Sequence, residues 1–168
     1  MIYDAVFIYI NVLHGNITGA EYQLDSAYIR SYLKKHNINT IQYINKNPGT
    51  LRNVVGEISQ IKSKRCVFYI NEYNYFVSKA IINLLKLNDS KIQIYAIGSV
   101  VKFISENLLD DILIDVCILD RYAFALKDIL SNSTLIDNIH CLVYKKDGSI
   151  IRTGVFEDNY SLDDLGLI

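Results

Sequence analysis

Small polar residues and glycines follow the short apolar runs of this 168-residue chain, and their types could bind a ligand. The loop at 11–19 has two glycines among polar residues just before an expected helix, so backbone N–H groups could face a phosphate or an amide. Similar loops follow three later runs. The candidate binding residues are Asn11, His14, Gly15, Asn16, Thr18, Gly19, Asn71, Glu72, Tyr73, Gly98, Ser99, Val100, Asp120, Arg121 and Tyr122.

The first loop carries neither the GxxxxGK pattern of a P-loop nor a GxGxxG fingerprint. Thr18 is expected to cap the following helix, with Glu21 completing a capping box, and this role is compatible with ligand binding. His14 is open to two interpretations, as a ligand or base and as an ordinary surface residue. We expect no catalytic and no metal-binding residues in the chain itself.

The residues at the strand ends can be compared with those of a response regulator. That function needs an acidic pair after the first strand, an aspartate at the end of the third strand and a lysine at the end of the fifth. The chain has Asn11-Val12, Ile70-Asn71 and Leu119-Asp120 at these places. The phosphoacceptor set is absent from the sequence, so this function is excluded.

Apolar runs alternate along the chain with stretches of helical periodicity. This alternation predicts a doubly wound α/β fold, flavodoxin-like or Rossmann-like, with a five-stranded parallel sheet. The ligand crevice of such a sheet lies beyond the carboxyl ends of its strands, where the candidate loops would meet. Strands are expected at 4–10, 40–44, 65–70, 91–97 and 114–119, and helices at 20–36, 50–63, 73–87, 101–109 and 122–130.

The last forty residues depart from this alternation. Residues 138–145 and 149–153 flank an Asp147-Gly148 turn, which predicts a β-hairpin. We expect one α/β domain over residues 1–154, made of a parallel core at 1–133 and the hairpin at 138–154. Residues 155–168 are acidic and irregular, as in a linker.

Charge and composition favour a cytoplasmic protein that binds neither nucleic acid nor a membrane. The net charge is −1 with a pI near 6.3, and no basic stripe is present. The three cysteines are far apart without a CxxC, and two lie in apolar runs, as expected of buried reduced thiols.

Four phrases along the chain resemble one known family. They are Tyr32-Leu33-Lys34-Lys35, Ile97-Gly98-Ser99 followed by residues 103–109, the hairpin at 139–153, and Ser161-Leu162-Asp163-Asp164-Leu165. They are similar to a "YLKKxGI" helix end, a Gly-Gly turn with a "PExLL" helix, a "GLxYRxxGxIxxT" hairpin and an "LDDLP" phrase. These belong to the N-terminal cobalamin-binding domain of cobalamin-dependent radical SAM enzymes, including the anaerobic magnesium-protoporphyrin IX monomethyl ester cyclase type.

The resemblance implies a cobalamin-binding module that is not catalytic in isolation. Its partner would be a C-terminal radical SAM domain of the same polypeptide, which would carry the iron–sulfur cluster and S-adenosylmethionine. The resemblance further implies that Tyr73, Tyr75 and Tyr122 line the crevice, and that Asn71 and Ser99 donate hydrogen bonds to the cofactor.

Several positions depart from the family pattern. The D-x-H-x-x-G motif is unmet, since Val12 and Ile17 occupy its Asp and Gly positions, which implies a cofactor held without a protein imidazole on cobalt. Ser99 replaces the second glycine of the turn, and residues 119–123 replace an "RGEGE" phrase. These departures leave open a degenerate domain used for docking or substrate recognition. A flavodoxin-like FMN-binding protein, with residues 15–19 at the phosphate, is a further alternative.

Overall fold

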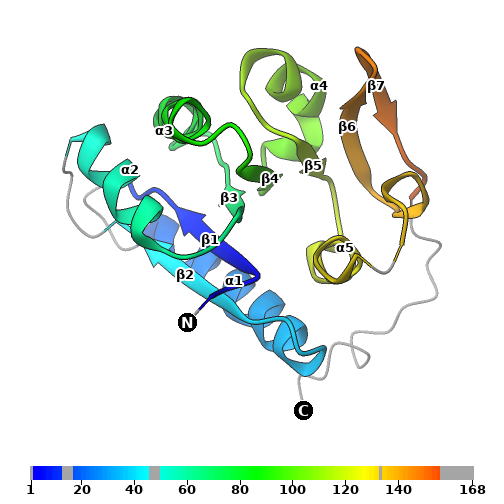
Figure 1. Ribbon diagram of the computed structural model, residues 1–168, viewed down its shortest axis with the longest axis horizontal. Coiled ribbons are helices and arrows are strands. Elements are labelled where there is room, and N and C mark those ends of the chain that lie inside the picture. Colours follow the sequence, from blue (N-terminus) through cyan, green and yellow to red (C-terminus); the bar gives the residue numbers. More distant parts are fainter. Residues whose placement is uncertain (1, 13–16, 46–49, 133, 156–168) are drawn as a thin grey trace.

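Strands that are buried on both sides form the centre of the molecule. The structure is a computed structural model that describes residues 2–12, 17–45, 50–132 and 134–155, without the side chains of residues 17–24. In these residues, seven strands form one sheet in the order β2-β1-β3-β4-β5-β6-β7 (Figure 1). Their bounds are β1 Ala5–Tyr9, β2 Thr40–Ile44, β3 Arg65–Tyr69, β4 Gln93–Ile97, β5 Val116–Ile118, β6 Leu142–Lys146 and β7 Ser149–Arg152.

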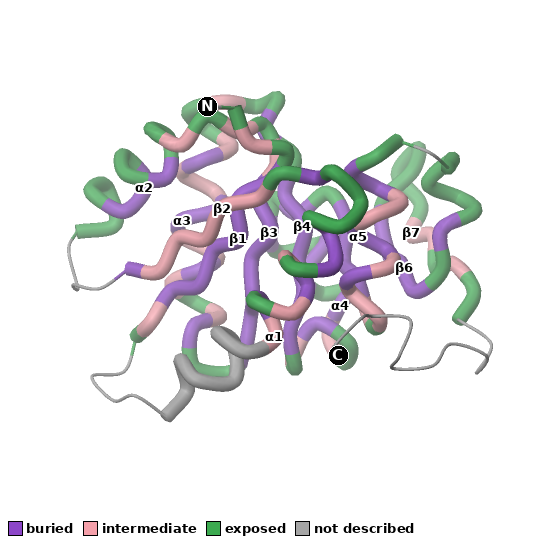
Figure 2. The backbone as a smooth tube through the Cα atoms, turned by 90° about the horizontal axis from the view of Figure 1, so that it is seen from below, coloured by how far each residue is buried: buried purple, intermediate pink, exposed green. Residues whose placement is uncertain are grey.

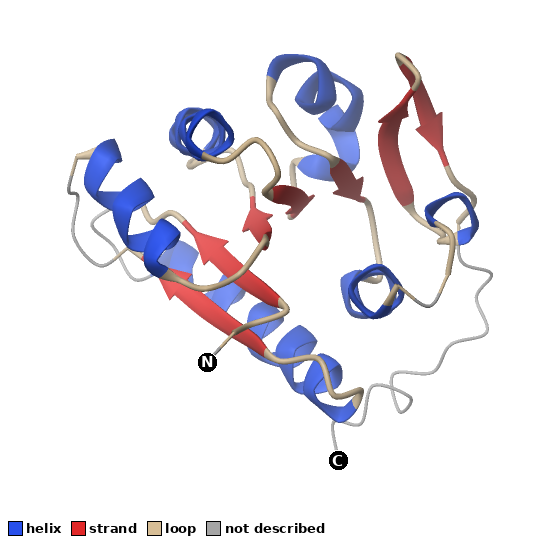
Figure 3. Ribbon diagram, in the orientation of Figure 1, coloured by secondary structure: helices blue, strands red, loops and turns tan. Residues whose placement is uncertain are grey.

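Within the described ranges, five α-helices cover the two faces of this sheet, as a doubly wound fold requires. Helices α1 and α5 lie on one face, and α2, α3 and α4 lie on the other (Figures 1 and 3). Their bounds are α1 Ile17–Lys35, α2 Leu51–Gln60, α3 Tyr75–Asn88, α4 Val101–Asp111 and α5 Tyr122–Ser131.

Alternate residues of each central strand enter opposite cores. Phe7 and Tyr9 pack towards α1 and α5, whereas Ile8 packs towards α2 and α3. All five residues of β1 are almost fully buried, so the strand reads as a continuous apolar run (Figure 2). The predicted α/β fold and the five parallel strands are therefore confirmed.

The sheet has seven strands and not the five predicted. The hairpin extends it: β6 pairs antiparallel with β5, aligning Leu142 with Ile118, and β7 forms the edge. Leu142, Val143 and Tyr144 are buried, and this burial requires cover on both faces, which a detached hairpin would lack. The Asp147-Gly148 turn is confirmed, since both residues have positive φ, of 51° and 79°.

Several predicted boundaries are wrong, and two of them have a clear local reason. The strand expected from residue 138 begins only at Leu142, because Ile136–Asn138 forms a 3-10 turn and Cys141 has a φ of 60°. Helix α1 begins at Ile17 and not at Ala20, so Thr18 lies inside its first turn. The capping role predicted for Thr18 is therefore wrong.

The three cysteines are buried in the sheet and its borders, and this predicts inert thiols. Burial raises the pKa of the Cys66 and Cys117 thiols to about 12, and Cys141 is 5% exposed. We expect no labelling by a thiol reagent at pH 8 in the folded protein and labelling of all three after denaturation in guanidinium. Rapid labelling of Cys66 or Cys117 in the folded protein, measured by mass spectrometry, would contradict their placement.

Candidate functional site

The carboxyl edge of the parallel strands has a topological switch point beside β1. The chain leaves β1 through α1 to reach β2 on one side, and later enters β3 on the other side. Connections that diverge to opposite faces open a crevice at such a point. Residues directly after β1 and β3 therefore border the place where a ligand would bind, and the end of β2 lies next to that of β1.

A Tyr-Ile-Asn triplet ends each of these three neighbouring strands: residues 9–11, 43–45 and 69–71. It sets Asn11, Asn45 and Asn71 in a row along the carboxyl edge, which we call the asparagine row. Of the three, Asn45 was missed by the sequence analysis. The repeated triplet is the signal that could have identified it.

Asn11 and Asn45 join the ends of β1 and β2. The Asn11 backbone N–H donates to Asn45 Oδ1 at 2.6 Å, and Asn45 Nδ2 donates to the Asn11 carbonyl at 3.3 Å. The side chain of Asn45 thus replaces a backbone ladder beyond the last paired residues. Asn11 Oδ1 is buried without a hydrogen-bond partner among the described residues, so it is an acceptor that a ligand could satisfy.

Asn71 and Asn74 hold the loop between β3 and α3 in a fixed shape. Asn71 Oδ1 accepts the backbone N–H groups of Tyr73 and Asn74, at 3.1 and 3.0 Å. Asn74 Oδ1 accepts the Asn71 N–H, and its Nδ2 donates to the Tyr69 carbonyl, both at 2.9 Å. This turn delays the helix predicted from residue 73 until Tyr75.

The loop presents Glu72 and Tyr73 at the crevice. Tyr73 is 53% exposed and Glu72 is exposed, whereas Asn71 and Asn74 are buried. Asn71 was expected to donate to a ligand; its Oδ1 holds the loop, so any such donation would come from its Nδ2. Tyr75, expected to line the crevice, packs against the core beneath α2 and α3.

Gly98 makes a sharp turn after β4, next to the same loop. Its φ is +122°, and a Cβ there would collide with the backbone of Ile70. Glycine is therefore required at this position by the packing of two strand ends, before any ligand is considered. Ser99 follows in the open, with its Oγ 3.5 Å from Glu72 Oε2, and Val100 precedes the first turn of α4.

The fourth loop lies after β5. Arg121 has a left-handed backbone with φ of 46°, and its N–H is bound by Asp120 Oδ1 at 2.7 Å. The Tyr122 hydroxyl donates weakly to the Gly98 carbonyl at 3.4 Å, which brings this loop to the β4 turn. Burial raises the pKa of Tyr122, so its hydroxyl stays neutral and able to donate.

The structure thus places most of the predicted residues at one edge. Asn11, the loops after β3 and β4, and the loop after β5 all lie at the carboxyl ends of the strands. His14, Gly15 and Asn16 lie outside the described residues. Thr18 and Gly19 belong to α1, but their side chains are outside the description.

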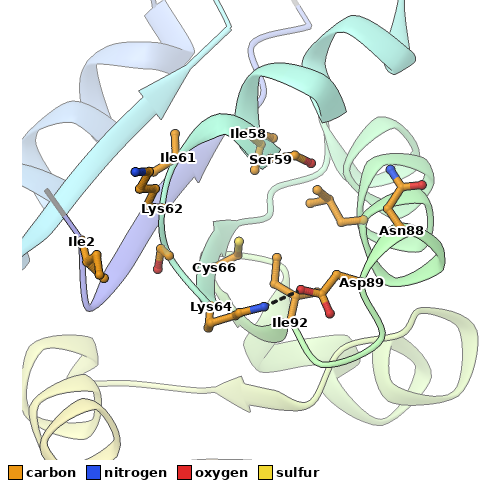
Figure 4. Close-up of a pocket in the computed structure, with 12 residues that line it drawn as sticks. Ile2, Ile58, Ser59, Ile61, Lys62, Lys64, Cys66, Asn88, Asp89 and Ile92 are labelled. Atoms are coloured by element: carbon orange, nitrogen blue, oxygen red, sulfur yellow. Dashed lines mark hydrogen bonds and ion pairs between the residues drawn. The ribbon is translucent and has the colours of Figure 1, made fainter.

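A cavity of about 550 Å³ lies at the opposite, amino end of the sheet, between the ends of α2 and α3. Figure 4 shows its Lys64–Asp89 ion pair, with the nitrogen 2.9 Å from the oxygen, and Cys66 at its wall. It contains none of the predicted residues. The described parts of the chain also hold no group of three metal-ligating side chains, and none of their helices is long and apolar enough to cross a membrane.

No protein-family model matches this chain, and no curated protein does. Solved structures that share its fold include those of OxsB and TsrM. OxsB is a cobalamin-dependent S-adenosylmethionine radical enzyme solved with aqua-cobalamin bound, and it matches at a TM-score of 0.72 and 12% identity over 92% of this chain. TsrM, from Kitasatospora setae, is a radical S-adenosylmethionine methyltransferase solved with cobalamin and an iron–sulfur cluster bound. It matches at a TM-score of 0.75, with 12% sequence identity over 92% of this chain.

This chain spans only 23% of the OxsB chain and 29% of the TsrM chain. The likeness establishes that the chain has the fold of one region of these larger proteins. Neither structure is described as a cyclase, so the magnesium-protoporphyrin cyclase type stays a prediction.

Proposed function

We propose that this chain is the cobalamin-binding module of a cobalamin-dependent radical SAM enzyme and works in the cytoplasm. The observation that carries the proposal is the asparagine row at the switch point. The shared fold with two cobalamin-bound enzymes supports it. A radical SAM domain of the same polypeptide, of methyltransferase or cyclase type, would hold the iron–sulfur cluster and S-adenosylmethionine.

The described residues fit a corrinoid chemically. A corrin ring is an apolar macrocycle rimmed by neutral amide side chains, which donate and accept hydrogen bonds as asparagine does. Asn11 Oδ1 offers a buried acceptor that lacks a donor among the described residues. The half-exposed ring of Tyr73 offers an apolar surface at the same edge of the sheet.

The roles divide among the loops. Asn11 and Ser99 would bind amides of the ring, and Tyr73 and Tyr122 would contact its apolar parts. Asn45, Asn71 and Asn74 would position these groups by fixing the loops. Bound cobalamin would supply the organometallic chemistry, while this chain would bind and orient it.

Replacing Ser99 by tryptophan tests the proposal. Ser99 is exposed beside the Gly98 turn, so the indole would fill the crevice without entering the core. We expect aqua-cobalamin to bind the parent chain and Ser99→Trp to bind about tenfold more weakly or worse. Co-elution of visible absorbance in gel filtration and a titration by difference absorbance measure this.

Ser149→Trp is the matched control, because Ser149 is also exposed but lies at the amino end, in the hairpin. It should bind aqua-cobalamin like the parent. A parent chain that takes up no aqua-cobalamin at micromolar concentration would refute the proposal and favour a docking domain. An equal loss of aqua-cobalamin binding in Ser99→Trp and Ser149→Trp would refute the placement of the site.

A further inference from the structure

We propose that two exposed phenylalanines, Phe76 and Phe103, form a docking surface for the catalytic domain that uses the cofactor. This inference rests on the proposed function, because it names the partner of the same crevice. We call these two residues the aromatic pair.

The aromatic pair lies next to the crevice. Strands β3 and β4 are neighbours that align Tyr69 with Ile97, and the loops beyond them meet at Glu72 and Ser99. Phe76 follows Glu72 by four residues, and Phe103 follows Ser99 by four residues. Each phenylalanine therefore lies in the first turn of the helix that follows this contact, Phe76 in α3 and Phe103 in α4.

Both side chains point away from the sheet. Phe76 is 79% exposed and Phe103 is 83% exposed. The buried face of α3 includes Ser78 and Ile82, and that of α4 includes Val101 and Ser105. Phe76 and Phe103 are each two positions from such residues, which places them on the opposite side of a 3.6-residue helix. They are not needed for the core.

Exposed aromatic residues are concentrated at this edge. Tyr73, Phe76 and Phe103 are the exposed large aromatic side chains of the described residues, and all three follow β3 or β4. The strongly exposed apolar residues elsewhere include aliphatic ones such as Leu87 and Leu135. Aromatic residues are enriched in the buried centres of protein interfaces, whereas scattered leucines need no partner.

The catalytic domain is the occupant that this location favours. A cofactor in the crevice reacts only with a group that reaches it from outside the carboxyl edge. The polypeptide that provides this group must pass over the rim where Tyr73 lies, and the aromatic pair continues this rim. In the two proteins of like fold, more than two thirds of the chain lies outside the matched region.

Hydroxyl-radical footprinting of the full-length enzyme and of the 168-residue chain tests the inference. The oxidation rate of Phe76 and Phe103, read by mass spectrometry, should fall about fivefold or more in the full-length enzyme. Leu87, 77% exposed on the far end of α3, and Leu135, 75% exposed, are matched internal controls and should oxidise equally in both. Aqua-cobalamin binding is measured on the same samples.

The outcomes separate the inference from the proposed function. Unchanged oxidation of Phe76 and Phe103 with cobalamin bound overturns the docking surface and leaves the module intact. Protection without any cobalamin binding overturns the proposed function instead. Protection that arises on concentrating the 168-residue chain alone assigns the surface to a second copy. A polypeptide without a further domain also overturns the inference.

A double variant tests whether the aromatic pair holds the catalytic domain in place. Phe76→Ser with Phe103→Ser should leave aqua-cobalamin binding by the 168-residue chain unchanged, since neither residue is among those proposed to bind the cofactor. In the full-length enzyme the same variant should restore the oxidation of Tyr73 to its rate in the 168-residue chain. Tyr73 that stays protected would show that the pair does not hold the domain.

Discussion

Gly98→Ala is expected to lower the free energy of unfolding by about 3 kcal/mol or more. The glycine has a φ of +122°, which residues with a side chain rarely adopt, and a Cβ would meet the carbonyl oxygen and nitrogen of Ile70. These are backbone atoms at the end of a central strand, so they cannot rotate away. A loss of this size is a large part of a domain's usual stability of about 5–15 kcal/mol.

Urea denaturation followed by circular dichroism measures this loss, and Gly56→Ala is its control. Gly56 lies inside α2, has no neighbouring atom within 4 Å of an added Cβ, and should stabilise the chain by about 0.5–1 kcal/mol when replaced. A Gly98→Ala chain that unfolds at the same urea concentration as the parent would contradict the packing of the β4 turn. Loss of ligand binding in a Gly98 variant reports on the fold, which is why Ser99 is the residue that tests the crevice.

The parallel core was predictable because burial on both faces leaves a simple pattern. β2 was predicted to the residue, and β1 and β3 to within one residue at each end, since their apolar runs stop at polar residues. Helix α2 begins one residue after its predicted start, because Thr50 is the cap whose Oγ1 accepts the Asn53 N–H. These boundaries depend on local composition alone.

The hairpin's place and the inner structure of the site depend on contacts distant in sequence. Nothing local indicates that Leu142 pairs with Ile118, because that pairing joins segments 24 residues apart. The candidate loops were predicted from topology, but the hydrogen bonds that Asn45 and Asn74 make were not. Asn11, the partner of Asn45, is 34 residues away and is identified only when β1 and β2 are aligned. Asn74 bonds to Tyr69 at the start of the same loop, but its side-chain geometry leaves no periodic pattern in the sequence.

Asn74→Ala is expected to destabilise the chain by about 3 kcal/mol, because it leaves two buried backbone groups unpaired. Asn74 is 1% exposed, and its side chain binds the Tyr69 carbonyl and the Asn71 N–H. Asn74→Asp should cost less if the carboxylate keeps the Asn71 bond, but it cannot donate to Tyr69. Thermal and urea unfolding measure both changes.

Asn107→Ala is the control for this loss. Asn107 is exposed on α4, and its replacement should change the free energy of unfolding by no more than about 0.5 kcal/mol. If Asn74→Ala changed the free energy of unfolding as little as Asn107→Ala does, the loop after β3 would not depend on the hydrogen bonds between Asn71 and Asn74. If it is as costly as expected, the loop that presents Glu72 and Tyr73 is held rigid before any ligand arrives. A corrinoid would then bind a preformed edge, without the entropic cost of ordering that loop.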